Sequence, residues 1–108
     1  MNAMMMEKLC ERATEVASLL KLMANEQRLV LLCRLRDGEA SVTELVTLCG
    51  QSQSGVSQHL ARLREGGVVS TRRDAKMIYY SLADKNIEAL MDFLCTHFAQ
   101  GVTRQPPE

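Results

Sequence analysis

One stretch of the chain, residues 52–64, limits its possible folds and functions more than any other. Apolar side chains recur there at helical spacing, at Val56, Leu60 and Leu63, which predicts a helix with one buried stripe. The opposite side carries hydroxyls and amides near its start and arginines near its end, in place of the glutamates and lysines of most exposed helices. Such a face can hydrogen-bond base edges and phosphates without a clash of bulk or sign. We therefore interpret this stretch as a DNA recognition helix.

A short helix and a turn precede the recognition helix. Ser41 and Glu44 have the spacing of a capping box, in which Ser41 accepts from the backbone of the third helical residue and Glu44 reaches back. The box opens a helix that places Leu45 and Leu48 inward and ends at the next glycine. Three polar residues form the turn, and Ser52 caps the recognition helix. Two helices joined in this way are a helix-turn-helix.

Two short segments rich in β-forming residues, 68–71 and 77–82, follow the recognition helix. The basic residues 72–76 lie between them, which predicts a β-hairpin with a charged tip. A hairpin directly after a recognition helix is a wing. The sequence therefore predicts a winged helix-turn-helix, mainly α-helical with a small β-hairpin wing.

Three further helices are predicted from apolar spacing and capping residues. The first covers about residues 6–23. The second is capped by Asn25 and stops near Asp37, and the last starts near Asp84. With the helix-turn-helix and the wing, the expected order is four helices, a hairpin and a fifth helix.

Length and composition predict one small cytoplasmic domain. A chain of 108 residues is expected to form a single winged-helix domain over residues 1–108, with an ordered core over about 7–100 and a flexible tail over 101–108. No apolar run approaches the roughly 18 residues of a membrane span, and the Met-rich start lacks the pattern of a signal peptide. We therefore expect a cytoplasmic protein with reduced thiols, without cofactor or membrane contact.

The charge of the chain is zero overall but unevenly distributed. Residues 51–80 hold five cationic and two acidic side chains, a net charge of +3, whereas residues 1–50 come to −1 and residues 81–108 to −2. Local charge sets the field at a binding surface, so the middle of the chain favours DNA. The predicted DNA-contacting residues are Gln53, Ser54, Ser57, Gln58, His59, Arg62, Arg64, Arg72, Arg73 and Lys76.

Other interpretations of these residues remain open. A solvated helix and an ordinary charged hairpin tip would show the same residue types, and His59 can satisfy a local hydrogen bond instead of contacting a phosphate. A dimerising interaction module without DNA contact is a further alternative. A thiol oxidoreductase would need an exposed cysteine of low pKa with a resolving partner, and no nucleophile–base pair is visible. We therefore do not expect an enzyme.

The chain resembles the ArsR/SmtB family of bacterial winged-helix repressors over roughly residues 7–100. The resemblance rests on four stretches, residues 19–29, 41–45, 52–64 and 71–80. Within the family, the chain is most similar to the sulfide- and persulfide-responsive branch. The resemblance implies a homodimer formed through the first and last helices, which binds an inverted-repeat operator and releases it when an inducer is sensed. Such pairing would also bury two apolar stripes that have no obvious partner within the chain, and would set the recognition helices about 34 Å apart.

Four cysteines, Cys10, Cys33, Cys49 and Cys95, favour reactive, metal-binding or buried thiols over a disulfide framework. The resemblance implies a sensor thiol at Cys33 and places its partner position at Ala99, one helical turn after Cys95. One turn is about 6 Å, and a disulfide needs about 4.4–6.8 Å between Cα atoms, so a Cys33–Cys95 bond requires a shifted last helix. A longer polysulfide bridge and a bond to Cys10 of the partner subunit are the alternatives. Cys49 is interpreted as structural.

The metal sites of the family have no match in the sequence. The arsenic-type site of the family uses closely spaced cysteines at the start of the third helix, and the corresponding residues 43–46 contain no thiol. The zinc-type site pairs Asp and His two positions apart, whereas Asp92 and His97 are five apart. No metal ligands are therefore predicted. The predicted function is a DNA-binding repressor released by persulfide, sulfide or an oxidant at Cys33 and Cys95. A metal(loid)-responsive or ligand-independent repressor with structural cysteines is the alternative, and activation by displacing another protein stays open.

Overall fold

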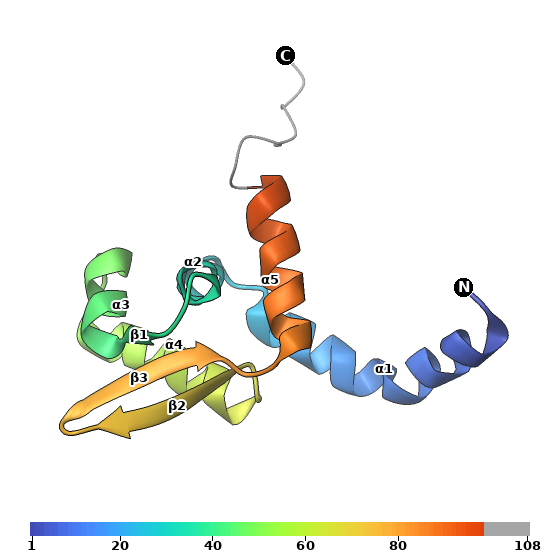
Figure 1. The fold of residues 1–108 in the computed structure, drawn as a ribbon, viewed down its shortest axis with the longest axis horizontal. Helices are drawn as coiled ribbons and strands as arrows, with labels where there is room; N and C mark the ends of the chain where they lie inside the picture. Colours follow the sequence, from blue (N-terminus) through green and yellow to red (C-terminus); the bar gives the residue numbers. More distant parts are fainter. Residues whose placement is uncertain (99–108) are drawn as a thin grey trace, which may run out of the picture.

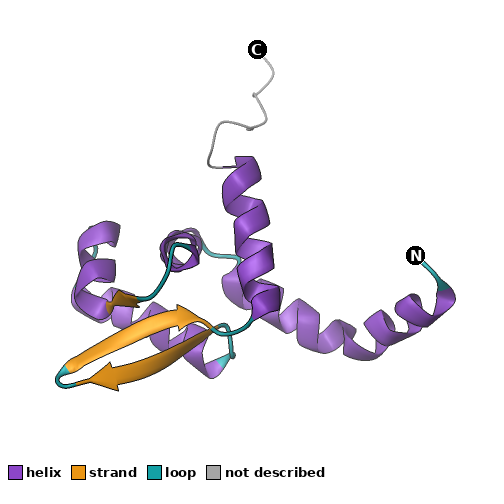
Figure 2. Cartoon of the chain, in the orientation of Figure 1, coloured by secondary structure: helices purple, strands orange, loops and turns teal. Residues whose placement is uncertain are grey.

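The computed structural model describes residues 1–98 (Figures 1 and 2). Its elements in chain order are α1 (Ala3–Met23), α2 (Glu26–Arg36), β1 (Ala40–Ser41), α3 (Val42–Cys49), α4 (Gln53–Glu65), β2 (Val69–Asp74), β3 (Met77–Leu82) and α5 (Lys85–Phe98). The predicted winged helix-turn-helix is confirmed. The predicted tail, residues 101–108, and the last two residues of the predicted core lie outside the described residues.

Side-chain caps set where the central helices begin. Asn25 Oδ1 accepts from the backbone N–H groups of Gln27 and Arg28 at 3.0 and 3.1 Å, which starts α2. At α3, Ser41 Oγ accepts from Glu44 N at 3.2 Å, and Glu44 Oε1 accepts from Ser41 N at 3.3 Å. These bonds satisfy backbone donors that the first turn of a helix leaves unpaired. The predicted cap of α2 and the predicted capping box are therefore confirmed.

Replacing Ser41 with Ala should lower the free energy of unfolding by about 1–2 kcal/mol. The substitution removes the acceptor of the Glu44 amide and leaves a gap at a side chain that is only 3% exposed. Urea denaturation followed by circular dichroism measures the change. Thr43→Ala, at an exposed position of the same helix, is the matched control. An equal loss in both variants would contradict a role for the box.

The wing has a tighter turn than predicted. β2 continues through Asp74 and β3 begins at Met77, so only Ala75 and Lys76 connect them. The predicted five-residue tip, 72–76, is therefore wrong, and its first three residues belong to the strand. A two-residue hairpin turn needs positive φ, and Ala75 has a φ of 56°. Nothing in the alanine side chain signals this conformation, which is why the sequence suggested a longer loop.

A third strand, absent from the prediction, joins the wing to the rest of the domain. β1 pairs antiparallel with β3, with Ala40 opposite Tyr80, and gives the strand order β1-β3-β2. Two residues are too few to show the alternation by which strands are recognised. The connection between α2 and α3 is thereby held against the wing.

The core lies where α2, α3, α4, α5 and the hairpin meet. Its largest fully buried side chains are Leu31, Leu32, Leu45, Val56, Leu60, Leu63, Val68 and Met91. The predicted inward stripe of the recognition helix is confirmed. The inward placement of Leu48 is wrong, because this side chain is 49% exposed. The inward position at the end of α3 is occupied by Cys49, which follows Leu45 by four residues and packs against the core.

Helix α1 runs away from the rest of the domain and contacts little of it (Figure 1). Only Met23 is buried in this helix, while Leu9, Val16 and Leu20 are 38–48% exposed. The helix also starts earlier than predicted, at Ala3, because Asn2 caps it. No helix within residues 1–98 is long and apolar enough to cross a membrane.

Candidate nucleic-acid interface and thiol site

The polar face of α4 is fully available to a ligand. All six of its predicted contact residues other than His59 are exposed: Gln53, Ser54, Ser57, Gln58, Arg62 and Arg64. Because Val56, Leu60 and Leu63 anchor the other face in the core, the polar face is held outward. Ser52 Oγ accepts from Gly55 N at 3.1 Å and fixes the first turn, as predicted. The structure therefore gathers the predicted hydroxyls, amides and arginines on one helix.

The cations of the wing differ in their availability. Arg72 donates two hydrogen bonds of 2.6 Å to the carboxylate of Glu39, and its guanidinium lies 4.6 Å from the ring centre of Tyr79. These bonds hold the pKa of Glu39 below its usual value. Arg73 and Lys76 are exposed and form no ion pair with any residue of 1–98. Sequence reasoning missed Glu39, because it precedes Arg72 by 33 positions and only the fold brings them together.

His59 is the one predicted contact residue of α4 that is partly buried. Its Nδ1 accepts from Arg28 Nε at 3.2 Å, and its Nε2 lies 3.3 Å from Gln27 Oε1. If Nδ1 accepts, the ring proton is on Nε2 and points to the amide oxygen. Burial, followed by the charges of Arg28 and Arg62, lowers the pKa of His59. Two roles were considered for His59, a local hydrogen bond and a phosphate contact. The structure shows the local hydrogen bond.

Two thiols meet between α2 and α5. The sulfur atoms of Cys33 and Cys95 lie 2.7 Å apart, and Cys95 is only 5% exposed. α2 therefore passes α5 at the level of Cys95, one helical turn before the position that the family resemblance implied, so the shifted arrangement left open above is the one found. The other two cysteines are elsewhere, with Cys10 exposed on α1 and Cys49 half-buried at the end of α3.

An apolar pocket opens beside this thiol pair. It has a volume of about 220 Å³ and is lined by Leu29, Cys33, Met91, Leu94, Cys95 and Phe98. Burial, followed by the hydrogen bond with Cys95, raises the pKa of Cys33 to about 12. At neutral pH the Cys33 thiol is therefore protonated, whereas the reactive form of a cysteine is the thiolate. Its reaction with an electrophile should accelerate as the pH rises.

Within residues 1–98, no three His, Cys, Asp or Glu side chains are grouped so that they could hold a metal ion. Asp92 and His97, the two residues compared with the zinc-type pattern, each contact a different neighbour. Asp92 pairs with Arg36 at 3.2 Å, and the His97 ring lies 4.3 Å from that of Phe93.

A helix-turn-helix whose second helix presents a polar face, followed by a basic hairpin, defines the winged helix-turn-helix class of DNA-binding proteins. The model of the bacterial regulatory protein arsR family matches residues 25–71. The chain is 43% identical over 101 residues to the transcriptional activator HlyU of Vibrio cholerae. The aligned residues cover 94% of this chain and 91% of HlyU. The chain belongs to the arsR family of bacterial regulatory proteins.

Solved structures of this family have the same fold. Reduced HlyU from Vibrio cholerae matches with a TM-score of 0.81 at 40% identity, over 87% of this chain and 99% of HlyU. The transcriptional repressor BigR from Xylella fastidiosa matches with a TM-score of 0.77 at 45% identity, over 91% and 97%. The homodimeric winged helix-turn-helix DNA-binding domain of Mb0332 from Mycobacterium bovis matches with a TM-score of 0.76 at 26% identity, over 92% of each chain. The predicted family is confirmed, and the chain is a DNA-binding transcriptional regulator, not an enzyme.

Proposed function

We propose that this chain is a cytoplasmic repressor that binds an inverted-repeat operator as a homodimer and is released by thiol chemistry at Cys33 and Cys95. The observation that carries this proposal is the 2.7 Å approach of the two sulfur atoms beside an apolar pocket. A disulfide bond is about 2.05 Å long, so little further approach is needed. The inducer is a persulfide, a sulfide-derived species or another oxidant.

The exposed face of α4 would read the operator in the major groove. Gln58 and Ser57 have the donors and acceptors that suit base edges, with Gln53 and Ser54 at the start of the helix. The phosphate contacts would come from the arginines of α4 and from the wing, at Arg62, Arg64, Arg72, Arg73 and Lys76. Arg72 and His59 differ from the other predicted contact residues in that they already have protein partners, Glu39 and Arg28.

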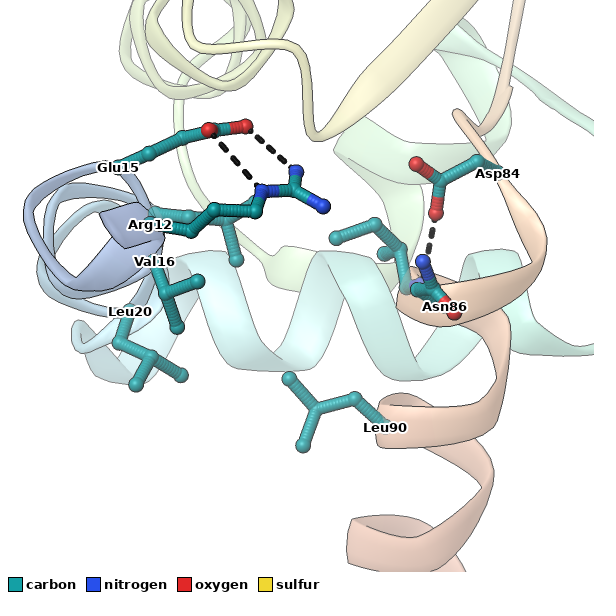
Figure 3. Close-up of a pocket in the computed structure, with 9 residues that line it drawn as sticks. Arg12, Glu15, Val16, Leu20, Asp84, Asn86 and Leu90 are labelled. Carbon is teal, nitrogen blue, oxygen red and sulfur yellow. Dashed lines mark hydrogen bonds and ion pairs between the residues drawn. The ribbon is translucent and has the colours of Figure 1, made fainter. Parts of the chain in front are cut away.

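A second copy of the chain would cover the exposed side of α1. Val16 and Leu20 of α1 and Leu90 of α5 line a groove of about 330 Å³ between the two helices (Figure 3). Phe93 and Phe98 of α5 are also more than half exposed. A twofold axis would pair these faces and repeat α4 one DNA turn away. The homodimeric state of the Mb0332 domain supports this assembly.

The proposed chemistry balances with a persulfide as the oxidant. Two thiols and one persulfide, RSSH, give a Cys33–Cys95 disulfide, a thiol RSH and hydrogen sulfide. The cysteine sulfurs lose two electrons in total, and the S–S bond of the persulfide is reduced. Further persulfide can insert sulfur atoms and lengthen the bridge. Either link joins α2 to α5 and would change the dimer geometry that sets the spacing of the two recognition helices.

The alternative is a metal(loid)-responsive or ligand-independent repressor in which these cysteines are structural. The burial of Cys95 and the apolar lining of the pocket also suit ordinary core thiols. Two adjacent thiols can in addition bind a thiophilic metalloid such as arsenite. These possibilities differ in the covalent products that they leave on the protein.

Mass spectrometry after treatment with an organic persulfide, peroxide or arsenite distinguishes the thiol-responsive, metal(loid)-responsive and ligand-independent repressors. We expect persulfide to join the peptides that contain Cys33 and Cys95, with a loss of two hydrogens or a gain of whole sulfur atoms. The Cys10→Ser and Cys49→Ser variants should give the same link. An arsenite adduct without a persulfide-dependent link would favour the alternative, and no reaction at either thiol would indicate structural cysteines.

A further inference from the structure

A chain of hydrogen bonds connects the recognition helix to two other helices. The Arg28 guanidinium on α2 donates through Nε to His59 of α4 at 3.2 Å and through Nη1 to the Leu22 carbonyl oxygen of α1 at 2.9 Å. Gln27 adds a second contact from α2 to the same imidazole, at 3.3 Å. These contacts join residues that are 31 and 32 positions apart in the sequence. They reach α4 beside Gln58, in the middle of its exposed face.

We propose that His59 is a positioning residue whose neutral imidazole, held by Arg28 and Gln27, fixes the orientation of the DNA-reading face of α4. Operator binding then weakens when this imidazole is protonated. This inference rests on the proposed reading of DNA by α4. In this proposal His59 contacts other residues of the protein and not a DNA phosphate.

Protonation would break the contact for a simple chemical reason. A neutral imidazole has one acceptor nitrogen, here Nδ1, whereas the protonated ring has two donors and no acceptor. The new Nδ1–H would face the Nε–H of Arg28, and a positive ring would lie near the guanidinium groups of Arg28 on α2 and Arg62 on α4. Both effects oppose protonation in the folded protein, in keeping with the lowered pKa of His59.

The sign of the pH dependence follows from this shift. A histidine with a lowered pKa binds its proton less readily in the folded state than in the unfolded state, so the contact is complete above about pH 6.5. It is lost as the pH falls from there through the lower pKa of the folded protein. A direct phosphate contact would have the opposite sign, because a protonated His59 would bind a phosphate more strongly.

The experiment measures operator affinity as a function of pH. The probe is a fluorescent duplex selected by the wild-type protein from a random-sequence library, and anisotropy is recorded between about pH 8 and about pH 5.5. We expect the wild-type affinity to fall measurably but by less than about ten-fold, because a His59 with a lowered pKa is only partly protonated at the acid end of this range. His97→Asn removes the other histidine of the chain and should leave this dependence unchanged.

Substitutions at position 59 separate positioning from charge. His59→Asn carries an amide oxygen near the place of Nδ1, so it should bind at pH 8 about as well as the wild type and show a flat pH profile. His59→Leu should bind about ten-fold more weakly even at high pH, because Arg28 loses its acceptor. Thermal denaturation confirms that each variant is folded. If His59→Asn does not fold, an NMR titration of the wild-type His59 ring on and off DNA replaces it: positioning predicts no rise in pKa on binding.

Three results of the binding measurements would overturn the inference: affinity that rises as the pH falls, a flat wild-type profile, or a wild-type dependence that disappears in His97→Asn. A His59 pKa that rises on DNA would do the same. If no duplex is selected by the wild-type protein at pH 8, the proposed DNA reading itself fails. A duplex that is selected but bound equally well at every pH would instead contradict only the role of His59.

Discussion

A Cys33→Ser protein is expected to remain on its operator after addition of an organic persulfide, under conditions that release the wild type. The serine cannot form a sulfur bridge to Cys95, so α2 and α5 stay unlinked. For the wild type we expect the affinity to fall by about 5- to 150-fold, the usual range of coupling between two sites. Fluorescence anisotropy with and without persulfide measures the difference.

Two controls make this result specific. Cys95→Ser should also stay bound, although its Cys33 can still acquire a single persulfide sulfur, because the link between the helices is missing. Cys49→Ser should be released like the wild type, since Cys49 lies at the end of α3. The wild-type reaction should accelerate as the pH rises, because burial and the contact with Cys95 raise the pKa of Cys33 and its thiolate is scarce near neutrality. Undiminished release of both Cys33→Ser and Cys95→Ser would eliminate this pair as the sensor.

Replacing both Ser57 and Gln58 with Ala should weaken operator binding by about ten- to one hundred-fold, because one bidentate base-edge contact such as that expected of Gln58 contributes roughly 1–3 kcal/mol. The salt dependence of binding should change little, since neither side chain is charged. Arg73→Ala should instead lower the salt slope by about one while weakening all sequences alike. Anisotropy titrations at several salt concentrations give both quantities.

The matched control for this pair of substitutions is Glu88→Gln, at an exposed position on α5 away from the recognition helix. It should bind like the wild type. Unaltered binding of the Ser57, Gln58 double variant would leave α4 without a reading role. In that case a dimerising interaction module would describe the chain better than an operator-binding regulator.

The sequence predicted the parts of the fold that local chemistry controls. Caps at Asn25, Ser41 and Ser52 and the stripe through Leu60 could be placed, because each depends on neighbours within one or two helical turns. The two-residue strand β1 and the outward turn of Leu48 could not. Both are decided by what packs against them, and such contacts leave no periodic pattern in the chain.

The candidate site also has a part that the sequence predicted and a part that only the fold shows. Residue type and spacing were sufficient to place the exposed face of α4, because that face is the complement of a buried stripe. The partners of Arg72 and His59, Glu39 and Arg28, come from distant positions and were missed. The meeting of Cys33 and Cys95 likewise depends on where α2 crosses α5, which family spacing had suggested was one turn further along.

Helix α2 and the segment that follows it contact both parts of the domain that are proposed to face DNA. Through Arg28 it holds the recognition helix, and through the segment that follows it, with Glu39 on Arg72 and β1 on β3, it holds the wing. The same helix carries Cys33. A change in the position of α2 would therefore reach the recognition helix and the wing through these contacts, and through the thiol pair it would reach α5.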